Sequence, residues 1–152
     1  MKQPNSKNCF VCGRENPYGL HLKFYETSPG EVTVEYTVPE QFQGYPGVVH
    51  GGVVAAILDE VTGRAQMGGS TPRFMFTARL DVRYRKNVPI GRPLKIIGRV
   101  GVSRERIATA NGQIFGPDGD LLAEAEAVLV NVPEAIVDNV DLDALGWKVD
   151  PD

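Results

Sequence analysis

The sequence predicts an α+β fold, in which a single long helix lies against a curled antiparallel sheet of about five or six strands. Two observations carry this prediction. Residues 51–67 show the only strong helical pattern in the chain, and runs typical of strands stand both before and after it. Since one helix covers only a small core, we also expect the chain to form an oligomer that buries more apolar surface.

Length and composition favour one domain spanning residues 1–152, because 42% of the residues are hydrophobic, which suffices for a core. The net charge of −3 argues against nucleic acid as the main partner. The sequence shows no apolar run of signal-peptide length at its start and none that could cross a bilayer later, so we expect no membrane partner. Two cysteines in such a chain indicate reduced thiols and a cytoplasmic location.

Two strands are predicted before the helix, at residues 20–27 and 31–38, joined by a turn at Ser28, Pro29 and Gly30. The second run alternates strictly between apolar and polar residues, which is typical of a half-buried antiparallel strand. Its apolar face consists of Val32, Val34, Tyr36 and Val38. A loop rich in proline and glycine, residues 39–49, leads into the helix.

The chain from about residue 76 to 131 reads as strands throughout, with turns near residues 87–93 and 116–120. In its first run, Ala78, Leu80, Val82 and Tyr84 share one face. Thr77 has the opposite parity in a regular strand. A contact between Thr77 and the helix therefore requires an irregular start to this strand.

Both ends of the chain differ in composition from its middle. Residues 1–19 are polar and loop-like, and we interpret them as an N-terminal cap. Residues 133–152 hold six acids and one lysine, which indicates a solvated extension or a short surface helix.

Cys9 and Cys12 have the spacing of half a zinc site. Zinc takes four ligands, the chain has no further cysteine, and His21 and His50 are poorly spaced to complete the set. A redox dithiol would be expected at a helix start in a βαβ unit, which is absent from the predicted pattern. We therefore predict a structural role for this pair, with no metal and no cofactor.

The predicted helix has two unlike faces when its residues are placed at 100° steps. An apolar stripe contains Val53, Val54, Ile57, Leu58, Val61 and Ala65. Asp59 lies almost opposite, among small neighbours: Gly52, Ala55, Ala56, Thr62 and Gly63. A solvated face normally carries long side chains, so the small ones indicate close approach of another helix or a ligand. Glu60 is explained without function by an i,i+4 ion pair with Arg64.

The helix start offers a second candidate site. Gly51 and Gly52 present backbone N–H groups at the positive end of the helix dipole, where they could bind a phosphate or polarise a carbonyl oxygen. His50 precedes them at the N-cap side, where its ring could bond to a neighbouring backbone group or contact a substrate.

These motifs together resemble a known family. The segment PGVVHGG, followed by AAILD with Asp59 eight residues after Gly51, is similar to the hotdog-fold acyl-CoA thioesterases of the phenylacetate-pathway (PaaI-like) group. CFVCG, NPYGL and FTARLDVRYRKNVPIG extend the resemblance from Cys9 to about Val132. Some members carry asparagine where this chain has Gly44, so any role of that side chain is missing here or supplied otherwise.

The resemblance implies a hotdog fold and hydrolysis of an acyl-CoA thioester without a cofactor. The Gly51 N–H would polarise the thioester carbonyl, Asp59 would act as general base or nucleophile, and Thr77 would orient the water. Eight residues place Asp59 roughly 12 Å along the helix from Gly51, so one helix cannot bring both groups to one carbonyl. Two antiparallel copies can, which agrees with the family's homodimer; a dimer of dimers is expected.

Basic residues give the strand edges local positive charge. Arg85 and Lys86 are the candidates for binding the phosphates of coenzyme A, and a solvated sheet face is the alternative for them and for Arg83, Arg104 and Arg106. Two other functions remain open on the same fold: a non-catalytic acyl-CoA-binding or regulatory protein, which would not need Asp59, and a hydratase, which would be expected to use a histidine as base.

Overall fold

The computed structural model describes residues 1–69 and 72–151, and it contains one long helix and six strands. The strands are β1 (Tyr25–Ser28), β2 (Glu31–Thr37), β3 (Met75–Tyr84), β4 (Pro93–Ser103), β5 (Ile107–Phe115) and β6 (Leu121–Asn131). The helices are α1 (Gly51–Ala65), the short α2 (Glu134–Val137) and the single 3₁₀ turn η1 (Glu40–Phe42). No helix among the described residues is both long and apolar enough to span a membrane.

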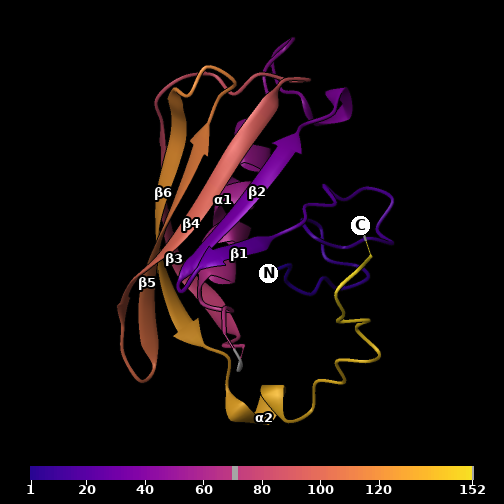
Figure 1. The fold of residues 1–152 in the computed structure, drawn as a ribbon, viewed down its shortest axis with the longest axis vertical. Coiled ribbons are helices and arrows are strands. Elements are labelled where there is room, and N and C mark those ends of the chain that lie inside the picture. The colour runs from indigo at the N-terminus through magenta and orange to yellow at the C-terminus, as the bar shows by residue number, and fades with distance from the viewer. Residues whose placement is uncertain (70–71, 152) are drawn as a thin grey trace.

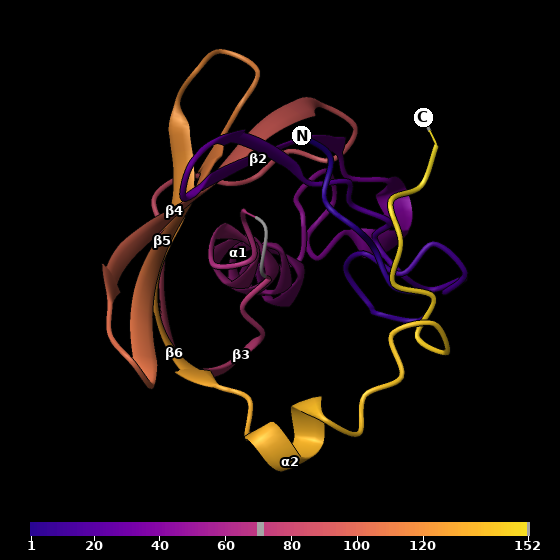
Figure 2. The same cartoon turned by 60° about the horizontal axis from the view of Figure 1, so that its bottom comes forward.

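The strands form one antiparallel sheet in the order β1-β2-β4-β5-β6-β3. The sheet curls around α1, which lies on its concave side (Figures 1 and 2). The predicted α+β fold, one helix wrapped by a curled antiparallel sheet, is therefore confirmed.

The apolar stripe of α1 packs against the sheet much as the periodicity predicts. Val54, Ile57, Leu58, Val61 and Ala65 are buried, and Val53 is half-buried. One position differs. Thr62, predicted on the small face beside Asp59, is fully buried.

Two glycines in the sheet explain why the helix lies so close to it. Gly98 and Gly112 are paired across β4 and β5 beneath the middle of α1. A Cβ added at Gly98 would lie 2.3 Å from the Val61 carbonyl oxygen, and one at Gly112 would lie 3.2 Å from Thr62 Cγ2. Because Gly98 and Gly112 have no side chains, the helix packs closely against the sheet, and Thr62 is buried in the contact.

The first predicted strand, residues 20–27, is shorter than expected. Only Tyr25–Ser28 pairs in the sheet, although Leu20, Leu22 and Phe24 are buried in the core. His21 adopts a left-handed backbone conformation, with φ of 59°, which interrupts an extended strand. The N–H groups of Leu20 and Leu22 instead donate to carbonyls of the N-terminal segment. The apolar residues are thus core residues of a loop.

The C-terminal tail corrects the expectation of a merely solvated extension. After α2, which is the short surface helix foreseen as the alternative, the chain passes around the open side of the sheet and returns to the N-terminal segment (Figure 2). The Lys148 and Asn5 backbones pair, and Asp150 forms a 3.1 Å ion pair with Arg14.

Arg64, at the end of α1, joins these two segments to the helix. Its guanidinium donates to the Pro4 carbonyl at 2.6 Å and to the Asn5 side chain at 3.2 Å. It also lies over the rings of Phe24, at 4.6 Å, and Trp147, at 5.0 Å. Only 2% of the Arg64 side chain is exposed, so both ends of the chain are tied to the C-terminal end of the helix.

Candidate functional site

Asp59 and Thr77 meet in the structure. The Thr77 hydroxyl donates a 2.6 Å hydrogen bond to Asp59 Oδ1. The irregular strand start that this contact requires is present, because the pairing of β3 with β6 shifts register between Thr77 and Arg79. The bulge at Ala78 changes the parity, so Thr77 faces the helix together with Leu80 and Val82, while Arg79 faces away.

Asp59 is half-buried and, among the described residues, has no cationic partner. It lines a cavity of about 290 Å³ together with Gly63, Phe76 and Thr77. A Cβ added at Gly63 would meet nothing within 4 Å, so this side of the helix is open beside the carboxylate. An ionised carboxylate that is held by one hydroxyl and has a free second oxygen can accept a proton or attack an electrophile.

Glu60, unlike Asp59, has a cationic partner. Its Oε1 forms the predicted ion pair with Arg64 Nε at 2.9 Å. Burial raises the pKa of the Glu60 carboxyl, and the Arg64 guanidinium partly offsets that effect. The pair belongs to the packing of the helix end and leaves Asp59 as the available acid.

The two cysteines lie beside this pair. The Sγ atoms of Cys9 and Cys12 and a Glu60 carboxylate oxygen lie within 4.8 Å of one another. Glu60 is a third possible donor that the spacing of cysteines and histidines alone does not indicate. Three donors are fewer than the usual four of zinc, and Arg64 already occupies Glu60 Oε1, so the absence of a metal stays a prediction.

The thiols of the pair differ strongly in acidity. A hydrogen bond from Cys12 lowers the pKa of the Cys9 thiol to about 6, with further help from the backbone N–H groups of Cys12 and Val11. The same side-chain bond, together with burial, raises the pKa of Cys12. Cys9 is partly exposed and Cys12 is buried, so Cys9 is the nucleophilic thiol of the two.

At the helix start, His50 is the N-cap of α1. Its Nδ1 accepts a 2.9 Å hydrogen bond from the Gly52 N–H, which is the backbone contact foreseen for the ring. The Gly52 N–H, predicted to bind substrate, is therefore already occupied. The Gly51 N–H has no hydrogen-bond acceptor among the described residues, so it is free to donate to a bound group.

Tyr84 also contacts this turn, which the strand pattern does not predict. Its hydroxyl donates a 2.6 Å hydrogen bond to the Gly51 carbonyl, so the end of β3 fixes the position of the helix start. The strand pattern placed Tyr84 on the apolar face. In the sequence, only the polar hydroxyl of this otherwise apolar side chain indicated that Tyr84 would form a hydrogen bond.

A cavity of about 650 Å³ opens at the helix start and is lined by Gly44, His50, Gly51, Tyr84, Arg85 and Lys86. Gly44 packs against His50, since a Cβ added there would lie 3.2 Å from the His50 Cα. Arg85 pairs with Glu124 and Lys86 with Asp120, each at 2.8 Å. Both cations border the cavity, yet each already has an acidic partner.

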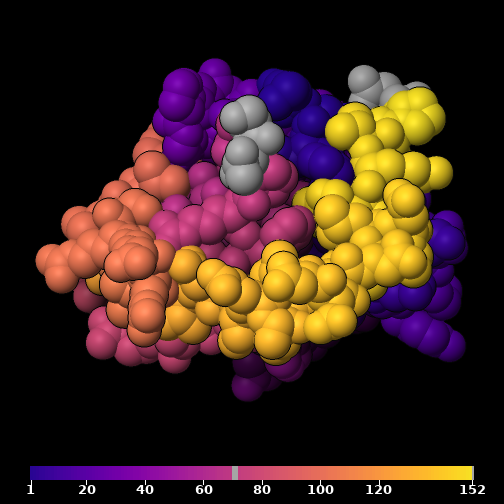
Figure 3. Space-filling model, turned by 90° about the horizontal axis from the view of Figure 1, so that it is seen from below, coloured from indigo at the N-terminus to yellow at the C-terminus, as the bar shows by residue number. Residues whose placement is uncertain are grey.

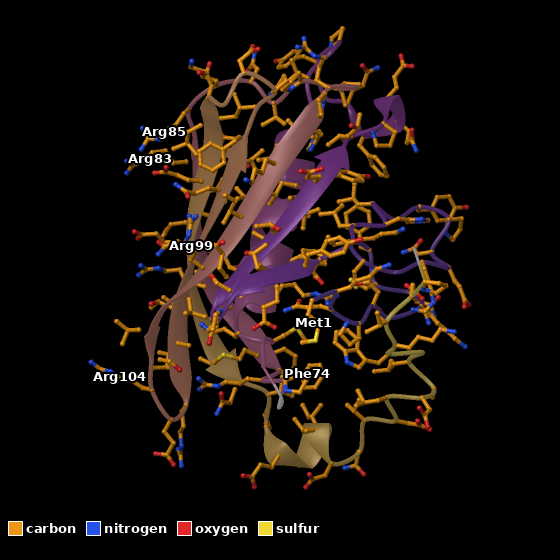
Figure 4. The ribbon with its side chains drawn as sticks, viewed as in Figure 1. Met1, Phe74, Arg83, Arg85, Arg99 and Arg104 are labelled. Atoms are coloured by element: carbon orange, nitrogen blue, oxygen red, sulfur yellow. The ribbon has the colours of Figure 1, made fainter. Side chains whose placement is uncertain are left out.

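Arg83, Arg104 and Arg106 line neither the cavity at the helix start nor the one that contains Asp59. Figure 4 shows Arg83 and Arg85 on the outer face at one end of the sheet and Arg104 at the opposite end. The cavities that contain Gly51 and Asp59 are lined by separate sets of residues. Because α1 is continuous from Gly51 to Ala65, the eight residue steps from Gly51 to Asp59 span about 12 Å along its axis. Within one chain, Gly51 and Asp59 therefore lie well apart, in different cavities.

Comparisons with known proteins agree with this architecture. Residues 46–123 match the thioesterase superfamily. The crystal structure of a thioesterase superfamily protein superposes with a TM-score of 0.75 and 33% identity, over 82% of this chain and 63% of the other. The PaaI protein of the Escherichia coli phenylacetic acid degradation operon has the same fold, with a TM-score of 0.68 at 15% identity over 75% of this chain and 81% of that one.

One curated relative is the acyl-coenzyme A thioesterase THEM4 of Xenopus laevis, which is 27% identical over 116 residues. The match covers 74% of this chain, and the chain spans 50% of the length of that relative. The resemblance to hotdog-fold thioesterases is thereby confirmed, and the chain belongs to the thioesterase superfamily.

Proposed function

We propose that this protein hydrolyses an acyl-CoA thioester to the free acid and coenzyme A. Membership of the thioesterase superfamily supports the reaction type, and the curated relative, itself named an acyl-coenzyme A thioesterase, supports the substrate class. The observation that carries the proposal is the half-buried Asp59 carboxylate, which is bound by the Thr77 hydroxyl and is not neutralised by any described cation.

The proposed chemistry needs little beyond this carboxylate. Asp59 Oδ2 would take a proton from a water that attacks the thioester carbon. Alternatively it would attack that carbon itself and form a mixed anhydride, which water then hydrolyses to the free acid. The Thr77 oxygen donates to Asp59 and keeps lone pairs that can accept a hydrogen bond from the same water. The C–S bond then breaks, and the coenzyme leaves as a thiolate. A simple thiol has a pKa of about 8.5, so its thiolate can leave without protonation by a strong acid.

The carbonyl oxygen would be bound by the Gly51 N–H of a second copy of the chain. A hydrogen bond reaches about 3 Å, far less than the roughly 12 Å between the two groups along one helix. β3 is an edge strand of ten residues, so its outer edge is available to pair with the same strand of another chain. The small residues around Asp59 would allow the two helices to approach.

The test compares two neighbouring acids. Asp59→Asn keeps an oxygen that can accept the Thr77 bond but loses the base, so it should lower kcat for acyl-CoA hydrolysis by about 10²-fold or more. Glu60→Gln is the matched control and should cost little activity. Hydrolysis is followed with a free-thiol reagent across a panel of acyl-CoA esters. Greater damage from Glu60→Gln, at unchanged stability, would reject the assignment, and acyl-CoA binding without turnover would favour the non-catalytic alternative.

A further inference from the structure

A second cavity, of about 490 Å³, lies between the C-terminal tail and the start of β3. We call it the tail cavity. Its principal walls are Phe74, Phe76, Ile136, Val140, Leu142 and Trp147. No Asp, Glu, Lys or Arg lines it, and its few polar groups come from the N-terminal segment. In an acidic tail, such a concentration of apolar side chains around a hollow is characteristic of a binding site.

The walls of the tail cavity are fixed by tertiary contacts. The Trp147 ring packs edge-on against Phe74, with 5.6 Å between centroids, and on the Arg64 guanidinium at 5.0 Å. Beyond Trp147, the Lys148 and Asn5 backbones are paired. Figure 4 places Phe74 at the same end of the molecule as α2, and Figure 3 shows the tail, in yellow, running along the side of the magenta helix region.

The apolar side chains of the tail gain little burial from the fold itself. Ile136 is 46% exposed, Leu142 40% and Leu145 48%. All three line the tail cavity. A tail that only covered the core would be expected to bury these groups, and their arrangement around a hollow suits an apolar occupant.

The tail cavity adjoins the cavity that contains Asp59. Phe74, Phe76, Cys9 and Trp147 line both. Phe76 directly precedes Thr77, whose hydroxyl binds Asp59. An apolar group that leaves a carbonyl carbon at Asp59 therefore has a continuous apolar path over Phe76 and Phe74 into the tail cavity.

We propose that the tail cavity receives an unbranched aliphatic acyl chain of the thioester, so that the enzyme prefers medium-chain substrates to acetyl and arylacetyl ones. This inference rests on the proposed function. Branched aliphatic side chains form most of the tail's side of the cavity, and no ionisable side chain other than the Cys9 thiol is available to recognise a polar acyl group. Coenzyme A, with its phosphates, does not fit walls without cations, so the acyl end is the occupant.

The kinetic test uses a straight-chain series of acyl-CoA esters, from acetyl to dodecanoyl, together with phenylacetyl-CoA. Each methylene that enters an apolar site should raise kcat/KM about fourfold until the cavity is full. Ala144 lines the tail cavity, and Ala144→Phe would fill it, so the ratio of kcat/KM for decanoyl-CoA to that for butanoyl-CoA should fall by about tenfold or more. Val149→Phe adds similar bulk at an exposed tail position outside the cavity and should leave the ratio unchanged.

A binding test needs no turnover. The chain has a single tryptophan, Trp147, in the wall of the cavity, so its fluorescence reports occupancy directly. Decanoate should change the Trp147 emission saturably in the native protein and in Val149→Phe, but at least tenfold more weakly in Ala144→Phe, and phenylacetate should bind more weakly than decanoate.

The outcomes separate the two proposals. A flat chain-length profile with no fluorescence response to decanoate would overturn the tail-cavity inference and leave thioester hydrolysis intact. Absence of hydrolysis with every ester would overturn the proposed function and, with it, the role of the tail cavity in binding substrate. Saturable binding of decanoate would in that case identify only a site for an aliphatic acid. A change of oligomeric mass in Ala144→Phe, without a change in the decanoyl-to-butanoyl ratio, would show that the cavity is a contact between copies of the chain and would also overturn the inference.

Discussion

Two inactive variants should restore activity to each other if each site uses two chains. Gly51→Pro deletes the N–H proposed to polarise the carbonyl, at the first position of α1, where proline is tolerated. The preceding His50, with φ of −55° and ψ of 134°, already has the conformation that a residue before proline prefers. Asp59→Asn removes the carboxylate charge and leaves the helix start unchanged. Each homodimer would then contain two defective sites.

The size of the recovery follows from the geometry. Because Gly51 and Asp59 are about 12 Å apart along one helix, a site that uses both groups would combine Gly51 of one chain with Asp59 of the other. A mixed dimer then holds one intact site and one site with both defects. Random association gives mixed dimers in about half of the population, so about a quarter of the native site concentration should return.

The assay measures thioester hydrolysis after the two variants are refolded together in equal amounts, with each refolded alone for comparison. Gly51→Ala is the matched control, since it keeps the N–H and its Cβ would meet Tyr84 at an ordinary 3.6 Å. It should retain most of the native activity. If native mass spectrometry detects mixed dimers and no activity returns, the reasoning is refuted and the base must be sought in the chain that contains Gly51.

Three further predictions test the surroundings of the site. Alkylation of Cys9 by iodoacetamide should reach half its maximal rate at about pH 6, because the lowered pKa of the Cys9 thiol populates the thiolate above that pH. Cys12, whose pKa is raised, should stay unreacted. A Cys9 rate that keeps rising toward pH 9 would contradict this. Replacing both cysteines by serine should leave activity and metal content unchanged, and stoichiometric zinc lost in the variant would prove that prediction wrong. Gly98→Ala should lower the free energy of unfolding in urea by about 1–3 kcal/mol, because its Cβ would overlap the Val61 carbonyl, whereas Gly63→Ala should raise it by about 1 kcal/mol; the same sign for both would count against the packing argument.

The helix and the strands around it could be predicted because their signals are local. Alternation in residues 31–38 and the period of residues 51–67 reflect which side chains face a core, and the structure has both elements. Periodicity could not foresee the burial of Thr62. That burial depends on Gly112, which lies on a strand fifty residues away and removes the side chain that would have kept the helix farther from the sheet.

Thr77 shows where pattern reasoning alone fails at the site. Strict alternation places Thr77 on the same face as Arg79, and nothing in the sequence of β3 indicates the bulge between these two residues. Only the family resemblance placed its hydroxyl near Asp59. The packing of the C-terminal tail could not be predicted for a related reason. Trp147 contacts Arg64 and Phe74, which lie far from it in sequence. A lone tryptophan in an acidic segment was the one signal that the tail packs against the fold.

Asp59 can serve as a base only if no cation neutralises it, and the packing of the helix end ensures this. Adjacent helix residues point about 100° apart, so Glu60 turns toward the cap while Asp59 turns toward Thr77. Arg64 is the nearest cation along the helix, but its guanidinium is already bound to Glu60, to Pro4 and to Asn5, between the rings of Phe24 and Trp147. Swinging it toward Asp59 would break all of these contacts and leave the raised-pKa carboxyl of Glu60 without its ion-pair partner. The cap that closes the helix end therefore also protects the charge of the proposed base.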